Sequence, residues 1–522
     1  MQILYTILFT LMMLIDWTRG SQAGSVWAIT VNCVGILFGI IIFTVLPRPT
    51  KNMKHYHVMW WLLSISVAVI YFIPWHQGRG YLIWLHYLSV VLNIALLGSL
   101  FLESWSLHLW KNAKSLRKYQ KWGALLWVAM MLYMCISPLK SVWPIWFLCL
   151  FGIYYIIPIS QTRKQQLFQG ILNGMIIGFF AIQIWAYGFR PYDVVRYTGA
   201  YMNANMNALM YLMTYIALLV KIYQSLYNSE NGRIPRLSFY TVLLAGMWGF
   251  MLMTGCRTAI YIAMLLTCCF GIAAFIRNFQ NGVSYGTNIL RNIVVAIMFP
   301  VLTSVVFVVC YATVRYLPCV LHHPVWLEME YAEWKVHSFD PWNSYKYINF
   351  DELLDEIKNR MPSLVEYNET KKEILSAHSG PVLTDTKVEA STDKYESMGM
   401  RKEIYWEYLQ NLNWHGHKLE EGHFQISENW HAYHAQNLWI QMAFYYGIPA
   451  GVLLLLLTAL TGIRCLVGIL SNISDDWRFF SALVWVAFFG FGMMECVWYP
   501  GQFILFLIFF TQKNCSSFNQ EV

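Results

Sequence analysis

The sequence predicts an all-α polytopic membrane protein with about 12–14 transmembrane helices, and three observations lead to this fold class. Hydrophobic residues make up 57% of the 522 residues. Charged residues make up only 12%, whereas a soluble globular domain has about 25%. Apolar runs of about 20 residues recur along the chain, and this length crosses a hydrocarbon core of about 30 Å.

The apolar runs number fourteen, and merging the shortest neighbouring pairs would give twelve. They lie at residues 3–17, 26–46, 57–74, 81–102, 122–136, 143–159, 168–188, 206–221, 238–254, 258–276, 292–314, 437–460, 479–494 and 501–511. The first run lacks a basic leader and an A-x-A cleavage site, which favours a membrane segment over a signal peptide. The eleven cysteines show no C-x-x-C spacing and fit small core residues.

The net charge of +8 is divided between two regions of opposite sign. Residues 317–436 contain 11 Lys and Arg against 20 Asp and Glu, a net charge of −9. The rest of the chain contains 25 against 8, a net charge of +17. An acidic loop on a basic membrane body does not resemble the basic patch that binds nucleic acid. We therefore expect membrane lipids, and no nucleic acid, as partners.

Lys and Arg accumulate in the cytoplasmic loops of membrane proteins and so indicate the orientation. The loops on one side contain 18 basic residues, and the short loops on the other side contain six. This distribution predicts that both termini are cytoplasmic and that the side with six cations faces outward. The outward cations are Arg19, Arg79, Lys140, Arg190, Arg196 and Arg257.

One outward loop is much longer than the others and divides the chain. The expected regions are N-terminal transmembrane helices at 1–167, transmembrane helices with two outward arginine motifs at 168–314, a large extracytoplasmic loop at 315–436, and C-terminal transmembrane helices at 437–522. Within the loop, three segments have the pattern of short amphipathic helices. These segments are residues 331–337, 350–361 and 400–412.

Three polar clusters interrupt the apolar sequence on the outward side. They are RYTGAYMNAN at residues 196–205, TGCRTA at residues 254–259 and HAYHAQNLWIQMAFYYG at residues 431–447. Taken singly, each also has a structural explanation. Asn205 fits the cap of a helix that begins at residue 206, the glycines fit turns, an outward arginine fits an anchor to lipid phosphate, and His434 fits a packing residue.

The coincidence of the clusters favours a catalytic site. Arg196 and Arg257 lie in turns that contain Gly or Asn, and His434 lies on the same side. Guanidinium groups bind phosphate oxygens bidentately, and fixed cations lower the barrier when a diphosphate leaves. A histidine with an unperturbed pKa of about 6.5 takes the proton from an attacking hydroxyl. These side chains predict a group-transfer site for a lipid diphosphate.

The chain resembles the O-antigen ligase and polymerase superfamily in three ordered motifs over about residues 168–460. The motifs are R-x-x-G-x-x-x-N-x-N from Arg196, the T-G-C-R turn that ends at Arg257, and H-x-x-N from His434 to Asn437 with Gly447 beyond it. The resemblance implies a C-type glycosyltransferase fold without metal or other cofactor. It also implies transfer of a glycan from an undecaprenyl-diphosphate carrier to a lipid, a growing glycan or a protein.

The resemblance implies the site residues as well. Arg196 and Arg257 match the arginines that engage the diphosphate in the family, and we expect both to act in catalysis together with His434. The substrate-binding residues that we expect are Gly199, Asn203, Asn205, Gln436 and Asn437.

The chain departs from the family pattern at three positions. It has Ala204 where Pro is frequent between the two asparagines, and Cys256 where Ser is frequent. Gln436 stands where ligases usually have the key histidine, and an amide cannot act as a base. Either His434 has taken that function or the acceptor is activated differently, with His431 and Glu428 as further candidates.

A metal site is not expected from the histidines of the long loop. Nine of the fourteen histidines lie there, but their spacing fits no zinc pattern with carboxylate or cysteine support.

The leading hypothesis is an O-antigen ligase-like glycosyltransferase that acts on an acceptor hydroxyl at the outer face of a bacterial inner membrane. An O-antigen or capsule polymerase of the same superfamily is the alternative, and the H-x-x-N re-entry with Gly447 favours a ligase. A lipid-linked glycan transporter is the alternative from another class. Transporters usually carry ionisable residues at mid-membrane depth, whereas Glu103 and Glu495 lie near segment ends.

Overall fold

The computed structural model describes twelve stretches of the chain, and 85% of the described residues are helical. The described residues are 1–15, 25–47, 53–72, 79–111, 118–139, 143–190, 196–201, 203–227, 233–321, 393–427, 430–497 and 503–514. The helices are α1 (Gln2–Leu14), α2 (Ser25–Val45), α3 (Met53–Phe72), α4 (Arg79–Ser106), η4 (Leu109–Lys111), α6 (Lys118–Ile136), α7 (Trp143–Ile156), α8 (Gln161–Phe189), α9 (Ala204–Tyr227), α10 (Arg233–Thr254), α11 (Arg257–Gln280), α12 (Tyr285–Val320), α16 (Asp393–Gln410), η5 (Leu419–Gly422), α17 (Leu438–Tyr446), α18 (Ile448–Ser471), α19 (Asp476–Gly492) and α20 (Phe503–Asn514).

The predicted fold class is confirmed as an all-α, multi-pass membrane protein. Each of the fourteen predicted apolar runs contains a described helix, and the run at 437–460 contains two, α17 and α18. Eight described helices are long and apolar enough to cross a membrane, namely α2, α4, α8, α9, α10, α11, α12 and α18. The break between α17 and α18 lies at Gly447, whose φ of +92° favours glycine. A Cβ there would lie 2.3 Å from the carbonyl oxygen of Trp414.

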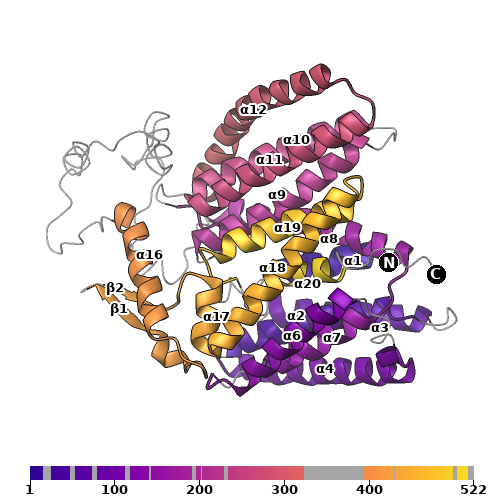
Figure 1. Ribbon diagram of the computed structural model, residues 1–522, viewed down its shortest axis with the longest axis vertical. Coiled ribbons are helices and arrows are strands. Elements are labelled where there is room, and N and C mark those ends of the chain that lie inside the picture. Colours follow the sequence, from indigo (N-terminus) through magenta and orange to yellow (C-terminus); the bar gives the residue numbers. More distant parts are fainter. Residues whose placement is uncertain are drawn as a thin grey trace.

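The helices run side by side between two ends of the molecule (Figure 1). One end, which we call the loop end, carries α16, α17 and the hairpin of β1 (Phe424–Ser427) and β2 (Trp430–Ala432). The opposite end, which we call the terminal end, carries the start of α1. The predicted helix at 400–412 corresponds to α16, and the segments 331–337 and 350–361 lie outside the described residues. The hairpin was not predicted, because its strands are too short for a periodic pattern.

Helix α9 is surrounded by other helices of the protein. The most apolar 18-residue window of α9 has a mean hydropathy of only 1.4, yet 94% of it is buried by protein. Helix α12 has the opposite character, because its most apolar window has a mean hydropathy of 2.8 and is 11% buried. Lipid chains are as apolar as leucine, so the most hydrophobic helix gains nothing from the protein interior. Helix α12 therefore faces lipid, while the more polar α9 is enclosed by α8, α10, α11 and α19.

Helices α1 and α8 approach closely along a row of glycines. A Cβ at Gly170 would lie 2.4 Å from Cβ of Tyr5, and one at Gly174 would lie 2.6 Å from Cβ of Phe9. Gly178 continues the row four residues later, against Met13. Small residues at this spacing let membrane helices pack through their backbones. The contact fixes α8, which leads directly to the first polar cluster.

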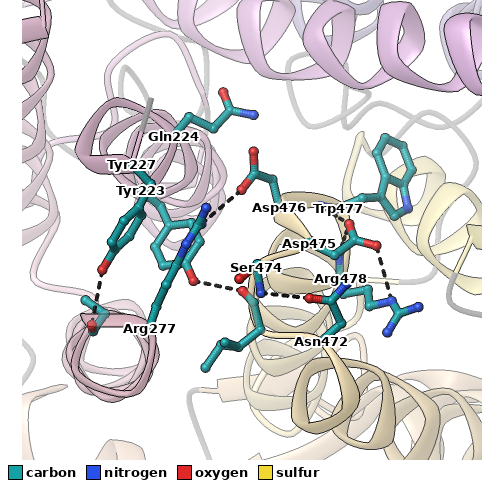
Figure 2. Close-up of polar contacts among 12 residues, drawn as sticks. Tyr223, Gln224, Tyr227, Arg277, Asn472, Ser474, Asp475, Asp476, Trp477 and Arg478 are labelled. Carbon is teal, nitrogen blue, oxygen red and sulfur yellow. Dashed lines mark hydrogen bonds and ion pairs between the residues drawn. The ribbon is translucent and has the colours of Figure 1, made fainter. Parts of the chain in front are cut away.

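A polar cluster at the terminal end joins α9, α11 and the turn before α19 (Figure 2). The guanidinium carbon of Arg277 lies 3.9 Å from the ring centre of Tyr227 and 4.9 Å from that of Tyr223. Arg277 Nη1 lies 3.6 Å from Oδ1 of Asp476. The Tyr223 hydroxyl donates a hydrogen bond to the carbonyl of Ile473 at 2.8 Å. Arg277, on α11, thus contacts both α9 and α19 and fixes the relative positions of the three helices.

We expect Arg277→Ala to lower the unfolding free energy by about 1–2 kcal/mol, because it removes cation–π contacts worth about 0.5–2 kcal/mol and a partly exposed ion pair worth less than about 1 kcal/mol. Thermal melting of the detergent-purified protein measures the change. Arg277→Lys keeps the charge without the planar group and should fall in between. Arg291→Ala, at an exposed position on α12, is the control, and equal melting of both alanine variants would contradict the expectation.

Candidate functional site

The first polar cluster forms a tight turn ahead of α9. Helix α9 begins at Ala204, and its cap is Asn203. Asn203 Oδ1 accepts from the backbone N–H of Asn205 at 2.8 Å, and its carbonyl accepts from that of Asn207 at 3.1 Å. The expectation that Asn205 caps a helix starting at residue 206 is therefore wrong, because the helix starts two residues earlier. The side chain of Asn205 is released for another contact.

Asn205 connects a cation to a carboxylate. Its Oδ1 accepts from Nη2 of Arg196, and its Nδ2 donates to Oε1 of Glu495. Arg196 also donates through Nε to the carbonyl of Thr254 at 2.8 Å. Glu495 is only 5% exposed and follows the end of α19. The structure thus brings Arg196 and Asn205 together and adds Glu495 as a partner of Asn205.

The second polar cluster is the turn between α10 and α11. The Thr254 hydroxyl accepts from the backbone N–H of Cys256 at 3.2 Å, and Tyr197 donates its N–H to the carbonyl of Met253 at 2.9 Å. This last contact binds the first cluster to the second. Cys256 is the residue before α11, and Arg257 is the first residue of that helix, half-buried.

The pKa of the Cys256 thiol depends on charged groups near this turn. Burial raises the pKa of the thiol, and the guanidinium groups of Arg196 and Arg401 lower it, whereas the carboxylate of Glu495 raises it further. Contacts place the same three residues near this turn: Arg196 donates to the carbonyl of Thr254, and Arg401 Nη1 lies 3.5 Å from the sulfur of Met494, the residue before Glu495. We call Arg196, Arg401 and Glu495 the charge cluster.

The third polar cluster holds Arg401 through Gln436. Arg401 on α16 donates from Nε to Oε1 of Gln436 at 3.0 Å, and the Tyr405 hydroxyl donates to the carbonyl of Gln436 at 3.2 Å. Gln436 has φ of +47°, a left-handed conformation that costs a residue with a side chain about 1–2 kcal/mol. These two contacts offset that cost. The position that holds a histidine in the resembled family here orients a cation.

Asn437 fixes the start of α17 to the end of α19. Its Oδ1 accepts from the backbone N–H groups of Trp439 and Ile440, both at 3.1 Å. Its Nδ2 donates to the carbonyl of Met493 at 3.2 Å, two residues before Glu495. Asn437 is thus a helix cap that also positions the segment carrying Glu495.

His434 makes its recorded contact within its own cluster. Its Nδ1 accepts from the backbone N–H of Gln436 at 3.3 Å, and the side chain is half-buried. Its function as a base stays a prediction. Of the two further candidates, Glu428 and the side chain of His431 lie outside the described part of the chain.

Gly199 shapes the first cluster through its backbone. Its φ is +55°, and a Cβ there would lie 2.9 Å from the side-chain amide of Asn207. Asn207 cannot move aside, since it is fully buried and donates to the carbonyl of Tyr197 at 3.2 Å. The carbonyl of Gly199 accepts from Nε of Arg190 at 2.6 Å. Gly199 therefore permits close approach of the turn to Asn207.

The structure adds three side chains that the sequence did not single out as site residues. These are Arg401, Tyr405 and Glu495. Arg401 and Tyr405 lie in the segment predicted to be an amphipathic helix before the third cluster. Glu495 is an acidic residue at the end of an apolar run. The amphipathic pattern and the acidic residue were both visible in the sequence, but neither shows which residues the side chains contact.

No protein-family model matches the chain, and no curated protein matches its sequence. Among the described residues, no group of three or more His, Cys, Asp and Glu is placed to hold a metal ion.

We expect Gly199→Ala to destabilise the protein by about 1–2 kcal/mol, because the new Cβ occupies a left-handed conformation and clashes with a fixed side chain. Thermal melting in detergent is the measurement. Gly271→Ala on α11 is the matched control, since no atom lies within 4 Å of its added Cβ and alanine favours a helix by up to about 1 kcal/mol. A melting temperature of Gly199→Ala at or above that of Gly271→Ala would count against this account of the turn.

Proposed function

We propose that the protein is a membrane glycosyltransferase that moves a glycan from an undecaprenyl-diphosphate carrier to an acceptor hydroxyl, as an O-antigen ligase does. The observation that carries the proposal is the charge cluster, in which Arg196 is held on the carbonyl of Thr254, just before Arg257, and Arg401 is held by Gln436 beside Met494 and Glu495. Arginines stay charged when partly desolvated and match phosphate oxygens in geometry. A site of this kind fits a ligand with several negative charges.

Helix geometry adds to the positive character of the site. The N-termini of α9, α11 and α17 belong to the three polar clusters, and the N-terminus of a helix carries a partial positive charge that favours phosphate. As the glycosidic bond to a diphosphate breaks, negative charge grows on the leaving oxygens. Cations that are already fixed stabilise this charge without reorganisation. The contacts of Arg196 with Thr254 and Asn205 supply such fixation.

The membrane arrangement belongs to the proposal. It comprises about 12–14 transmembrane helices in a C-type glycosyltransferase fold within a bacterial inner membrane, with the loop end outside and both termini in the cytoplasm. The Lys and Arg distribution supports this orientation. Contacts of the first and last described helices also support cytoplasmic termini on one side, because both lie near the start of α8. A Cβ on Gly170 of α8 would touch Tyr5 of α1. Lys513 of α20 donates to the carbonyl of Ile157 at 2.6 Å, just before α8.

The fate of surface glycan in a deletion strain tests the proposed function. If complete chains accumulate on the undecaprenyl carrier while the acceptor stays bare, the protein is a ligase. If single repeat units reach the acceptor without a ladder, it is the polymerase of the same superfamily. Unchanged pools of carrier-linked and acceptor-linked glycan would contradict both and favour the transporter.

We expect Arg196→Ala to weaken the binding of undecaprenyl diphosphate by about 10–100-fold, because one charged hydrogen bond contributes about 1.5–3 kcal/mol. Binding to the full chain in lipid nanodiscs is the measurement. Arg401→Ala should weaken binding in the same direction, and undecaprenyl monophosphate should be less sensitive to both changes. Arg291→Ala removes an exposed arginine of α12 and serves as the control. Wild-type affinity in a folded Arg196→Ala protein would refute the diphosphate assignment.

A further inference from the structure

Glu495 is an unusual carboxylate for the end of a membrane helix. It is nearly fully buried, and its Oε1 accepts a hydrogen bond from Nδ2 of Asn205. Among the residues that the structure describes, Asn205 is the one hydrogen-bond donor to this carboxylate, and no ion pair reaches it. A buried charge is costly unless other charges or hydrogen bonds compensate it. Arg196 and Arg401 of the charge cluster provide this compensation without a direct ion pair.

The amide of Asn205 separates Glu495 from Arg196 while it fixes both. A direct ion pair would commit the carboxylate oxygen to the guanidinium. With the neutral amide between them, the donor end faces the carboxylate and the acceptor end faces Arg196. Arg401 Nη1 lies 3.5 Å from the sulfur of Met494, the neighbour of Glu495 in the chain. The carboxylate therefore lies among the proposed phosphate ligands without a salt bridge to them.

The usual position of the base is occupied by a residue that cannot accept a proton. Gln436 is an amide, and its side-chain oxygen already accepts from Arg401. Nδ1 of His434 accepts the backbone N–H of Gln436. In a neutral imidazole with Nδ1 as the acceptor, the other ring nitrogen carries the hydrogen. The lone pair that would take a proton is thus already engaged.

We infer that Glu495 accepts the proton of the acceptor hydroxyl, an inference that rests on the proposed glycosyl transfer. The hydroxyl oxygen forms a bond to the anomeric carbon of the sugar as the bond from that carbon to the diphosphate oxygen breaks. The proton of the hydroxyl passes to the carboxylate of Glu495. The electron pair of the broken bond leaves with the lipid diphosphate, whose charge Arg196, Arg257 and Arg401 stabilise. Glu495 then releases its proton to water.

Glu495→Gln tests the inference because it removes the proton acceptor and leaves an amide oxygen that can still accept from Asn205. Two quantities are measured for each variant. One is the binding of undecaprenyl diphosphate to the full chain in nanodiscs, and the other is the ratio of acceptor-linked to carrier-linked glycan in the complemented deletion strain. We expect Glu495→Gln to bind within about threefold of wild type and to transfer at least 100-fold less glycan, the usual contribution of a general base.

Two further variants complete the test. Glu103→Gln, which removes a carboxylate near the end of another apolar run, should keep all of the transfer activity, and His434→Gln tests the base that the sequence predicts. Loss of transfer in His434→Gln with intact binding would overturn the inference, even if Glu495→Gln did not fold. It would also be overturned by normal transfer in Glu495→Gln, or by parallel loss of binding and transfer, which would make Glu495 a positioning residue. Failure of the wild-type protein in both measurements would instead reject the proposed function.

Discussion

The loop end depends on the side-chain amide of Asn205, which stands between a cation and an anion. An amide has distinct donor and acceptor ends, and here they face Glu495 and Arg196. If either partner turned away, a buried polar group would lose its hydrogen bond at a cost of about 1–3 kcal/mol. Arg196 in turn holds the carbonyl of Thr254. One amide therefore ties the segment before α9, the α10–α11 turn and the end of α19 together.

The membrane explains why the polar clusters lie at the ends of the helices. Unsatisfied polar groups in hydrocarbon cost several kcal/mol each, and polar side chains near the loop end bond to one another. Gln183 donates to the Tyr197 hydroxyl at 3.1 Å and accepts from Tyr211 at 2.8 Å, and Asn207 donates to Tyr211 at 3.2 Å. These hydrogen bonds hold Tyr197, which lies in the turn before α9. They also explain the modest hydropathy of α9, whose polar residues require a protein interior instead of lipid.

The sequence predicted what local patterns determine. Each of the eight described helices that are long and apolar enough to cross a membrane overlaps a predicted apolar run, because the length and hydrophobicity of a span are properties of a contiguous segment. The polar clusters were likewise visible, because polar residues are rare in such a chain. The partners were not predictable. Glu495 lies 290 residues from Asn205, and Arg401 lies 35 residues from Gln436, so neither contact leaves a periodic trace. Sequence alone could not decide which asparagine caps α9, because two asparagines of equal capping ability stand two positions apart.

The glutamine at position 436 has a clear physical consequence. A histidine there would be a proton acceptor, and when protonated it would repel a nearby arginine. Glutamine offers a neutral carbonyl oxygen that accepts from Arg401, so the third cluster contributes a fixed cation instead of a base. The arginines then outnumber the single carboxylate of the charge cluster. A surplus of positive charge that is held in place before the ligand arrives suits a diphosphate, and it leaves the proton to a group outside the third motif.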